Sequence, residues 1–242
     1  MLNHLPLEFK LLDSATFSGF FAGKNQPLLC ALQDFLNPNN TKEFFYLWGK
    51  TQVGKTHLLQ ACCNNAVGVN IQAMYLSLNN ILDIASANSQ HNIDNFFYGL
   101  DNIPLLCLDD IQIIIANNYL EEKLFYLFNN IRAKKNKLII AANLPPANLE
   151  LSLPDLKSRL SWGITYHLQE LNDQEKIAAL MMRAEQIGLQ LSEAVAMFLL
   201  ARIARSTGQL FAILERLDNA SLAAKHKLTV PFVKQVLGLY LF

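Results

Sequence analysis

Five short runs of nearly uninterrupted apolar residues alternate with segments of mixed polarity over the first part of the chain. The runs lie at 44–48, 73–78, 103–108, 137–142 and 163–168. Continuous apolar character over this length predicts strands covered on both faces, as in a parallel sheet. Helical patterning fills three of the intervening segments, at 57–65, 120–134 and 155–160. We therefore predict an α/β fold with a five-stranded parallel sheet between helical layers.

An irregular segment precedes this alternating region, and a helical one follows it. Pro27 suits the start of a helix over 27–36, where its missing N–H costs nothing. Beyond the fifth run no strand-like pattern remains, and three or four helices are predicted at roughly 173–187, 192–205, 208–226 and 230–240. We predict three parts, which are an N-terminal segment 1–25, an α/β domain 26–170 and a helical domain 171–242.

The segment 49–56 reads GKTQVGKT and matches the pattern GxxxxGK[ST] in full. It follows a predicted strand and opens a predicted helix, which is the context that a phosphate-binding loop requires. Glycines let the backbone curl so that N–H groups converge on phosphate oxygens, and the helix N-terminus adds a favourable dipole. Lys55 would reach the β- and γ-phosphates, and the Thr56 hydroxyl would bind Mg²⁺. The residues expected at the nucleotide here are Gly49, Gln52, Val53, Gly54, Lys55, Thr56 and His57.

Polar side chains end two of the predicted strands. Asp109 and Asp110 close the run at 103–108, and Asn143 follows the run at 137–142. Because open α/β sheets bind ligands at the carboxyl ends of their strands, Asp109 is expected to hold Mg²⁺ through water. Asp110 could act as a general base on water or could cap the next turn. Asn143 could orient water near the γ-phosphate or could be an ordinary loop residue.

Two basic candidates have simpler explanations when the residues are taken alone. Arg159 lies on a short predicted helix between two strands, where it could reach a phosphate on a neighbouring subunit. A surface arginine on an amphipathic helix is the simpler explanation when the residue is taken alone. His57 directly follows the phosphate-binding motif, and a position on the helix surface is its simpler interpretation.

Composition narrows the classes of function. Lys+Arg and Asp+Glu both number 20 among 242 residues, whereas a domain that grips duplex DNA by itself is usually basic. The four cysteines form no zinc-ligand pattern, so we predict buried, reduced thiols. No signal peptide or long apolar span is visible, and we expect a cytoplasmic protein without a membrane anchor.

These motifs together resemble the DnaA family of AAA+ ATPases and, within it, the Hda subfamily of regulators that inactivate DnaA. The resemblance covers nearly the whole chain. Its most specific passages lie at 16–25, at 46–48 before the phosphate loop, and in LSLPDLKSRL at 151–160 and KLTVPFVK at 227–234. It implies an AAA+ domain with a C-terminal helical lid, and ADP or ATP with Mg²⁺ as ligands.

The resemblance also implies roles for single residues and for partners. It assigns Arg159 as an arginine finger offered in trans to ATP on DnaA, and Asn143 as the sensor-1 residue. It places the segment from Phe17 to Asn25 beside the base and ribose. Members of this subfamily join the DNA polymerase III sliding clamp on DNA and promote hydrolysis of DnaA-bound ATP. Nucleic acid would thus be reached only through the clamp, own hydrolysis would be weak, and a homodimer is consistent with the family.

Three departures from the family pattern affect these expectations. No DNA-reading helix-turn-helix segment follows the lid before Phe242, which favours a regulator over an initiator. Gly208 stands where the lid arginine of sensor 2 is expected, with Arg205 as a nearby substitute. The clamp-binding motif of the QLSLPL kind is matched only by Leu5, Pro6 and Leu7, without its glutamine. That segment could dock in a groove on the clamp or could be a disordered terminus.

Two other functions remain open at the level of sequence. A helicase loader or clamp-loader-like ATPase acting on single-stranded DNA would need basic loops along a channel, which the neutral composition disfavours. A nucleotide-binding scaffold without catalysis is compatible with Gly208.

Overall fold

A computed structural model describes residues 11–79, 81, 90–203, 206–224 and 226–239. The chain divides into two compact units. The first holds the described residues up to Phe17 together with Asn25–Lys50 and Lys55–Leu168. The second holds Ser18–Lys24, Thr51–Gly54 and the described residues from Gln169 onward.

The first unit is built on a five-stranded sheet in the order β2-β3-β4-β1-β5, and all four pairings are parallel. Its strands are β1 Phe44–Trp48, β2 Ala73–Ser77, β3 Leu105–Asp109, β4 Lys137–Ala142 and β5 Ile164–His167. Every residue of β3 is buried, as expected for a central strand covered on both faces. The fold class predicted from the apolar runs is therefore confirmed, with strand ends that differ from the prediction by at most two residues.

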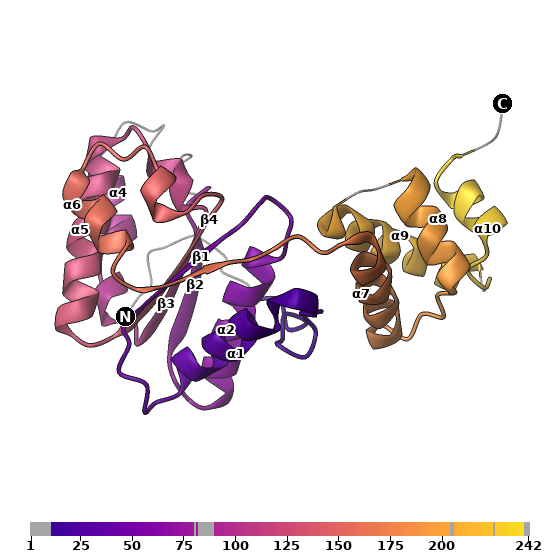
Figure 1. Cartoon of the computed structure of the whole chain (residues 1–242), viewed down its shortest axis with the longest axis horizontal. Coiled ribbons are helices and arrows are strands. Elements are labelled where there is room, and N and C mark those ends of the chain that lie inside the picture. The colour runs from indigo at the N-terminus through magenta and orange to yellow at the C-terminus, as the bar shows by residue number, and fades with distance from the viewer. Residues whose placement is uncertain (1–10, 80, 82–89, 204–205, 225, 240–242) are drawn as a thin grey trace. The chain divides into compact units, whose positions relative to one another are not determined.

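Helices cover both faces of the sheet (Figure 1). One face carries α1 Gln26–Leu36 and α2 Lys55–Gly68, and the other carries α4 Gln90–Phe97, α5 Asn118–Ala133 and α6 Pro154–Leu160. Short 3-10 helices connect them, which are η1 Gly23–Asn25, η2 Leu100–Asn102, η3 Ile111–Ile114 and η4 Pro146–Asn148. Helix α4 was not predicted, because its sequence is largely polar and only Ile93, Phe96 and Phe97 form a buried stripe.

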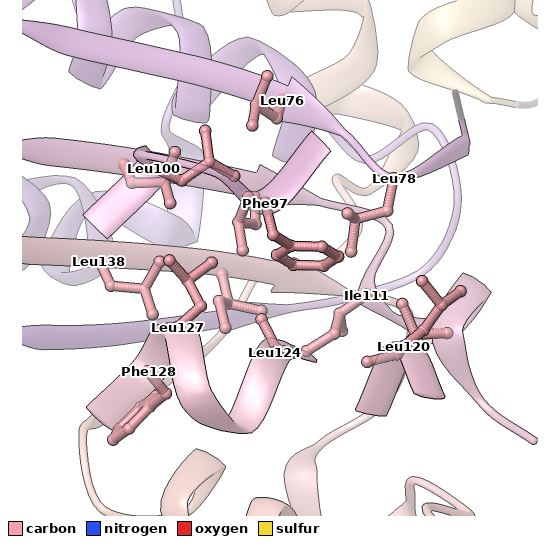
Figure 2. Packing of buried hydrophobic residues seen from close by; sticks show 14 of the residues in the cluster. Leu76, Leu78, Phe97, Leu100, Ile111, Leu120, Leu124, Leu127, Phe128 and Leu138 are labelled. Carbon is pink, nitrogen blue, oxygen red and sulfur yellow. The ribbon is translucent and has the colours of Figure 1, made fainter. Parts of the chain in front are cut away.

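The main core lies between the sheet and helices α4 and α5. Leu124, Leu127 and Phe128 follow one another at helical spacing on α5 and are buried with Phe97 and Leu138 (Figure 2). Phe125 is partly buried and packs against the same core. Full burial of each such side chain stabilises the fold by about 1.5–3 kcal/mol, and this core fixes the strand ends that carry the site.

The second unit contains a bundle of helices whose ends follow sequence signals. They are α7 Asp173–Gln186, α8 Glu193–Arg202, α9 Thr207–Ala224 and α10 Val230–Val236. Asn172 and Glu175 form a capping box at the start of α7, and Ser192 caps α8. Gly188 adopts φ +76° just after α7, a conformation that glycine takes without strain. None of the described helices is long and apolar enough to cross a membrane.

The cysteines follow the prediction at three of four positions. Cys62, Cys63 and Cys107 are buried free thiols, and burial raises the pKa of Cys62 and Cys107. For Cys30 the prediction of burial was wrong, because this residue is exposed on α1. The buried side of that helix is formed by Leu28, Leu29, Leu32 and Phe35.

Candidate functional site

The phosphate-loop motif connects the end of β1 to the start of α2. Gly49 N donates to Ala142 O at 3.2 Å, which ties the loop to the neighbouring strand. Gln52 and Gly54 have φ values of +65° and +109°, so the chain turns sharply between them. A Cβ on Gly54 would lie 2.8 Å from the Phe20 ring, so glycine is required there for space as well as for conformation. Successive left-handed turns of this kind gather backbone N–H groups into an anion-binding concavity.

Lys55 is held inside its own loop. Its Nζ donates to Gly49 O and Lys50 O, both at 2.8 Å, and the side chain is 7% exposed. Burial lowers the pKa of Lys55, while the nearby carboxylates of Asp109 and Asp110 act in the opposite direction. The Lys55 ammonium is therefore already ordered and largely removed from solvent. It could exchange its two carbonyl partners for phosphate oxygens.

Thr56 and Asp109 bring two oxygens together at the head of the loop. Thr56 Oγ1 donates to Asp109 Oδ2 at 2.6 Å, and Tyr75 Oη donates to the same oxygen at 3.1 Å. Asp109 is only 1% exposed, and burial raises its pKa, although the hydrogen bond from Thr56 opposes the shift. Tyr75 was not predicted; its position on the apolar strand beside the acidic one is the signal that could have found it.

This pair fits a magnesium ion bound together with a nucleotide. The hydroxyl of Thr56 and the carboxylate of Asp109 are hard oxygen ligands, which Mg²⁺ prefers. Within the described part of the chain, no three His, Cys, Asp or Glu side chains form a ready-made metal site.

Asp110, Gln112 and Asn143 form a hydrogen-bonded row beside this pair. Asp110 adopts φ +60°, and its carboxylate accepts from Asn79 Nδ2 at 2.5 Å and from Gln112 Nε2 at 2.9 Å. Gln112 Oε1 accepts from Asn143 N at 3.2 Å. The structure thus brings the two sequence candidates together through Gln112, which sequence reasoning missed because an amide in a short 3-10 turn carries no motif.

The N-terminal segment is attached to the first turn of α2. His57 Nε2 lies 2.9 Å from Thr16 O, so the half-buried ring contacts this segment rather than only the helix surface. Phe17 is half-buried, and Asn25 is buried immediately before α1. The predicted clamp-binding residues Leu5, Pro6 and Leu7 lie outside the described residues.

Inside the second unit, the loop residue Gln52 contacts the start of α9. The Ser206 hydroxyl donates to Gln52 Oε1. A Cβ on Gly208 would lie 3.2 Å from Gln52 Cβ, so this amide fills the space next to the glycine. Gly208 has no side chain that could reach a phosphate, and Arg205 lies outside the described residues.

Arg159 lies near the end of α6, well separated in sequence from the loop. Its guanidinium carbon is 4.0 Å from the centroid of the Trp162 ring. The start of the helix is held by Glu121, whose Oε2 accepts from Leu153 N at 2.8 Å. Glu121 is fully buried, so α6 is fixed to α5 by an interior contact.

Comparison with known proteins gives two family matches. A family model described as the bacterial DnaA ATPase domain matches residues 11–167. A second, described as the Hda lid domain, matches residues 173–237. A Haemophilus influenzae protein, described only as uncharacterized, is 41% identical over 241 residues, which cover 99% of this chain and 100% of the relative.

Solved structures share the fold. Domain III of the Thermotoga maritima replication initiation protein DnaA superposes with a TM-score of 0.80 at 20% identity, over 95% of this chain and 98% of that one. AMPPCP-bound DnaA from Aquifex aeolicus gives 0.73 at 22% identity, over 86% of this chain and 66% of that one. At these identities the likeness establishes architecture, and the chemistry has to be argued from the site.

Proposed function

Because this chain belongs to the bacterial DnaA ATPase family and carries an Hda lid domain, we propose that it is a nucleotide-bound regulator of replication initiation. Its direct role is to promote hydrolysis of ATP held by DnaA. The observation that carries the proposal is an arginine on α6, Arg159, whose charge no described carboxylate neutralises. An arginine finger must meet a phosphate with its charge intact.

The chain's own site is proposed to hold ADP or ATP. The loop N–H groups and Lys55 would contact phosphate oxygens, and Thr56 with Asp109 would hold Mg²⁺, which when bound neutralises phosphate charge. Adenine is favoured because the family resemblance indicates it and the related Aquifex aeolicus DnaA was solved with AMPPCP. Phe17 and Asn25 are proposed to face the base and ribose.

Hydrolysis by this chain itself is proposed to be weak. Gly208 supplies no lid arginine, and the Asp110 carboxylate already accepts two side-chain hydrogen bonds. A general base must be free to accept a proton from water. Asn143, which is exposed, is retained as the proposed sensor-1 residue. The nucleotide in this site would then act mainly to set the conformation in which the chain meets its partner.

Partners follow from the same proposal. DnaA would receive Arg159, and the DNA polymerase III sliding clamp would bind the N-terminal Leu5, Pro6 and Leu7. The balance of 20 basic and 20 acidic residues favours contact with DNA through the clamp rather than by this chain alone. A homodimer of this chain is also proposed.

The test is phosphate release from ATP-loaded DnaA mixed with this protein, the clamp and DNA, with omission of each component in turn. We expect hydrolysis to rise only in the complete mixture. Replacement of Arg159 by Ala should abolish the stimulation, since an arginine finger in trans is worth on the order of a thousandfold or more. An unaffected DnaA, together with ATPase activity of this chain that single-stranded DNA increases, would instead identify a loader-type ATPase.

A further inference from the structure

The end of helix α6 carries an exposed tryptophan with two arginines on its ring. Trp162 is 55% exposed. The guanidinium carbon of Arg159 lies 4.0 Å from the ring centroid, and that of Arg132 lies 4.9 Å from it. Both distances are within the range of a cation–π contact. An exposed indole that meets two cations is an arrangement that simple burial of apolar surface does not explain.

The backbone fixes the ring at this place. Trp162 N donates to Arg159 O at 3.1 Å, so the chain turns at the end of the helix and returns the indole to the arginine three residues earlier. The next residue, Gly163, is wedged against β1, because a Cβ there would lie 2.3 Å from Phe44 Cδ1 and 2.6 Å from Phe44 O. The backbone that carries the indole is therefore fixed by contacts with the end of α6 and with β1, and not by the side chain of Arg159.

Two arginines in the described part of the chain have a carboxylate partner, and Arg159 does not. Arg132 has Glu43 Oε2 at 3.9 Å, and Arg183 has Glu215 Oε1 at 3.6 Å. For Arg159, no carboxylate of the described residues lies within ion-pair distance, and the indole face is its recorded side-chain partner. An aromatic face restricts the rotamers of an arginine without neutralising it, whereas a carboxylate would do both.

We propose that Trp162 is a positioning residue for Arg159, holding its guanidinium over the indole so that the arginine meets a phosphate on the partner in a restricted geometry and with its full charge. This inference rests on the proposed function for the role of Arg159. In this proposal Trp162 itself does not contact the nucleotide. An exposed cation–π contact favours the held geometry about two- to fivefold over the free side chain.

The test compares Trp162→Ala, Trp162→Leu and Trp162→Phe in the stimulated hydrolysis of DnaA-bound ATP, measured over a range of concentrations of this protein. We expect Ala and Leu to lower the maximal rate about two- to fivefold with little change in the half-saturating concentration, and Phe to retain most of the rate. Arg132→Ala, which removes the other cation from the same ring, should leave the maximal rate unchanged. A wild-type maximal rate in Trp162→Ala, an effect confined to half-saturation, or equal rescue by Leu and Phe would overturn the proposal.

A second readout needs no partner and separates this inference from the proposed function. The chain has two tryptophans, so in a Trp48→Phe background Trp162 is the only indole that emits. Arg159→Ala should increase quenching of this emission by acrylamide, because the guanidinium no longer covers the ring. Unchanged quenching contradicts the stacking itself. Increased quenching together with no effect of Arg159→Ala on DnaA would refute the proposed function while leaving the stacking in place.

Discussion

Two ionisable side chains at the phosphate loop are buried, and burial disfavours the charged form of each. The pKa of Lys55 is lowered, and the pKa of Asp109 is raised. Phosphate and Mg²⁺ would favour the charged forms that burial opposes. At the scale of single residues, burial therefore disfavours the charged forms of Lys55 and Asp109, and a bound nucleotide with Mg²⁺ would stabilise them.

This gives a prediction for the ligand-free protein with Asp109→Asn. Because the folded pKa of Asp109 is above its unfolded value, the native state binds the proton more tightly, and wild-type stability is lost as pH rises through the folded value. Asparagine has no such proton. As pH rises above about 4, the unfolding free energy of the variant should increase relative to that of the wild type. Urea denaturation at several pH values measures it, and a difference that is independent of pH would contradict the assignment.

At the scale of elements, the strands were predictable and the contacts between strand ends were not. Apolar runs such as 137–142 predict β4 to the residue, because a strand buried on both faces needs an apolar side chain at nearly every position. Helix α4 was missed because only three of its residues are buried. Tyr75 and Gln112 were missed because their partners, Asp109 and Asn143, are distant in sequence and meet only when the sheet order is known.

The junction of α6 and β5 gives a prediction of stability. Gly163→Ala would place a Cβ against the backbone oxygen of Phe44, which no change of rotamer can relieve. We expect a loss of about 1–3 kcal/mol in unfolding free energy. Gly68→Ala is the matched control, because nothing lies within 4 Å of its added Cβ and alanine is the better helix former. Equal melting temperatures for the two variants would show that the Gly163 contact is not tight.

Glu121 gives a second prediction for the start of α6. Replacement by Ala removes the acceptor of the half-buried Leu153 N–H and should cost about 0.5–1.5 kcal/mol, the net worth of a typical intramolecular hydrogen bond. Glu121→Gln keeps an oxygen acceptor in the same place and should cost less. Among the described groups, Glu121 Oε1 has no hydrogen-bond partner, so the amide of Gln would replace an atom that makes no bond. If Gln is as destabilising as Ala, the hydrogen bond to Leu153 is not the cause.

For the whole molecule, the residues proposed to hold phosphate and metal coexist with features that disfavour turnover. Lys55, Thr56 and Asp109 are in place, whereas position 208 carries no arginine and Asp110 is already hydrogen-bonded. Arg159 lies on another element without an acidic partner among the described residues. A protein that binds its own nucleotide stably and contributes an arginine to another would have this combination.

The most direct test is a single-turnover measurement in which labelled ATP is bound to DnaA before this protein, the clamp and DNA are added. Wild type, Arg159→Ala and Arg159→Lys are compared, with excess unlabelled ADP so that released label comes from DnaA. We predict fast release with wild type, loss of stimulation on the order of a thousandfold with Ala, and poor rescue by Lys, whose point charge lacks the planar fork of arginine. Equal release with wild type and Arg159→Ala would contradict the claim that Arg159 acts on the ATP of DnaA.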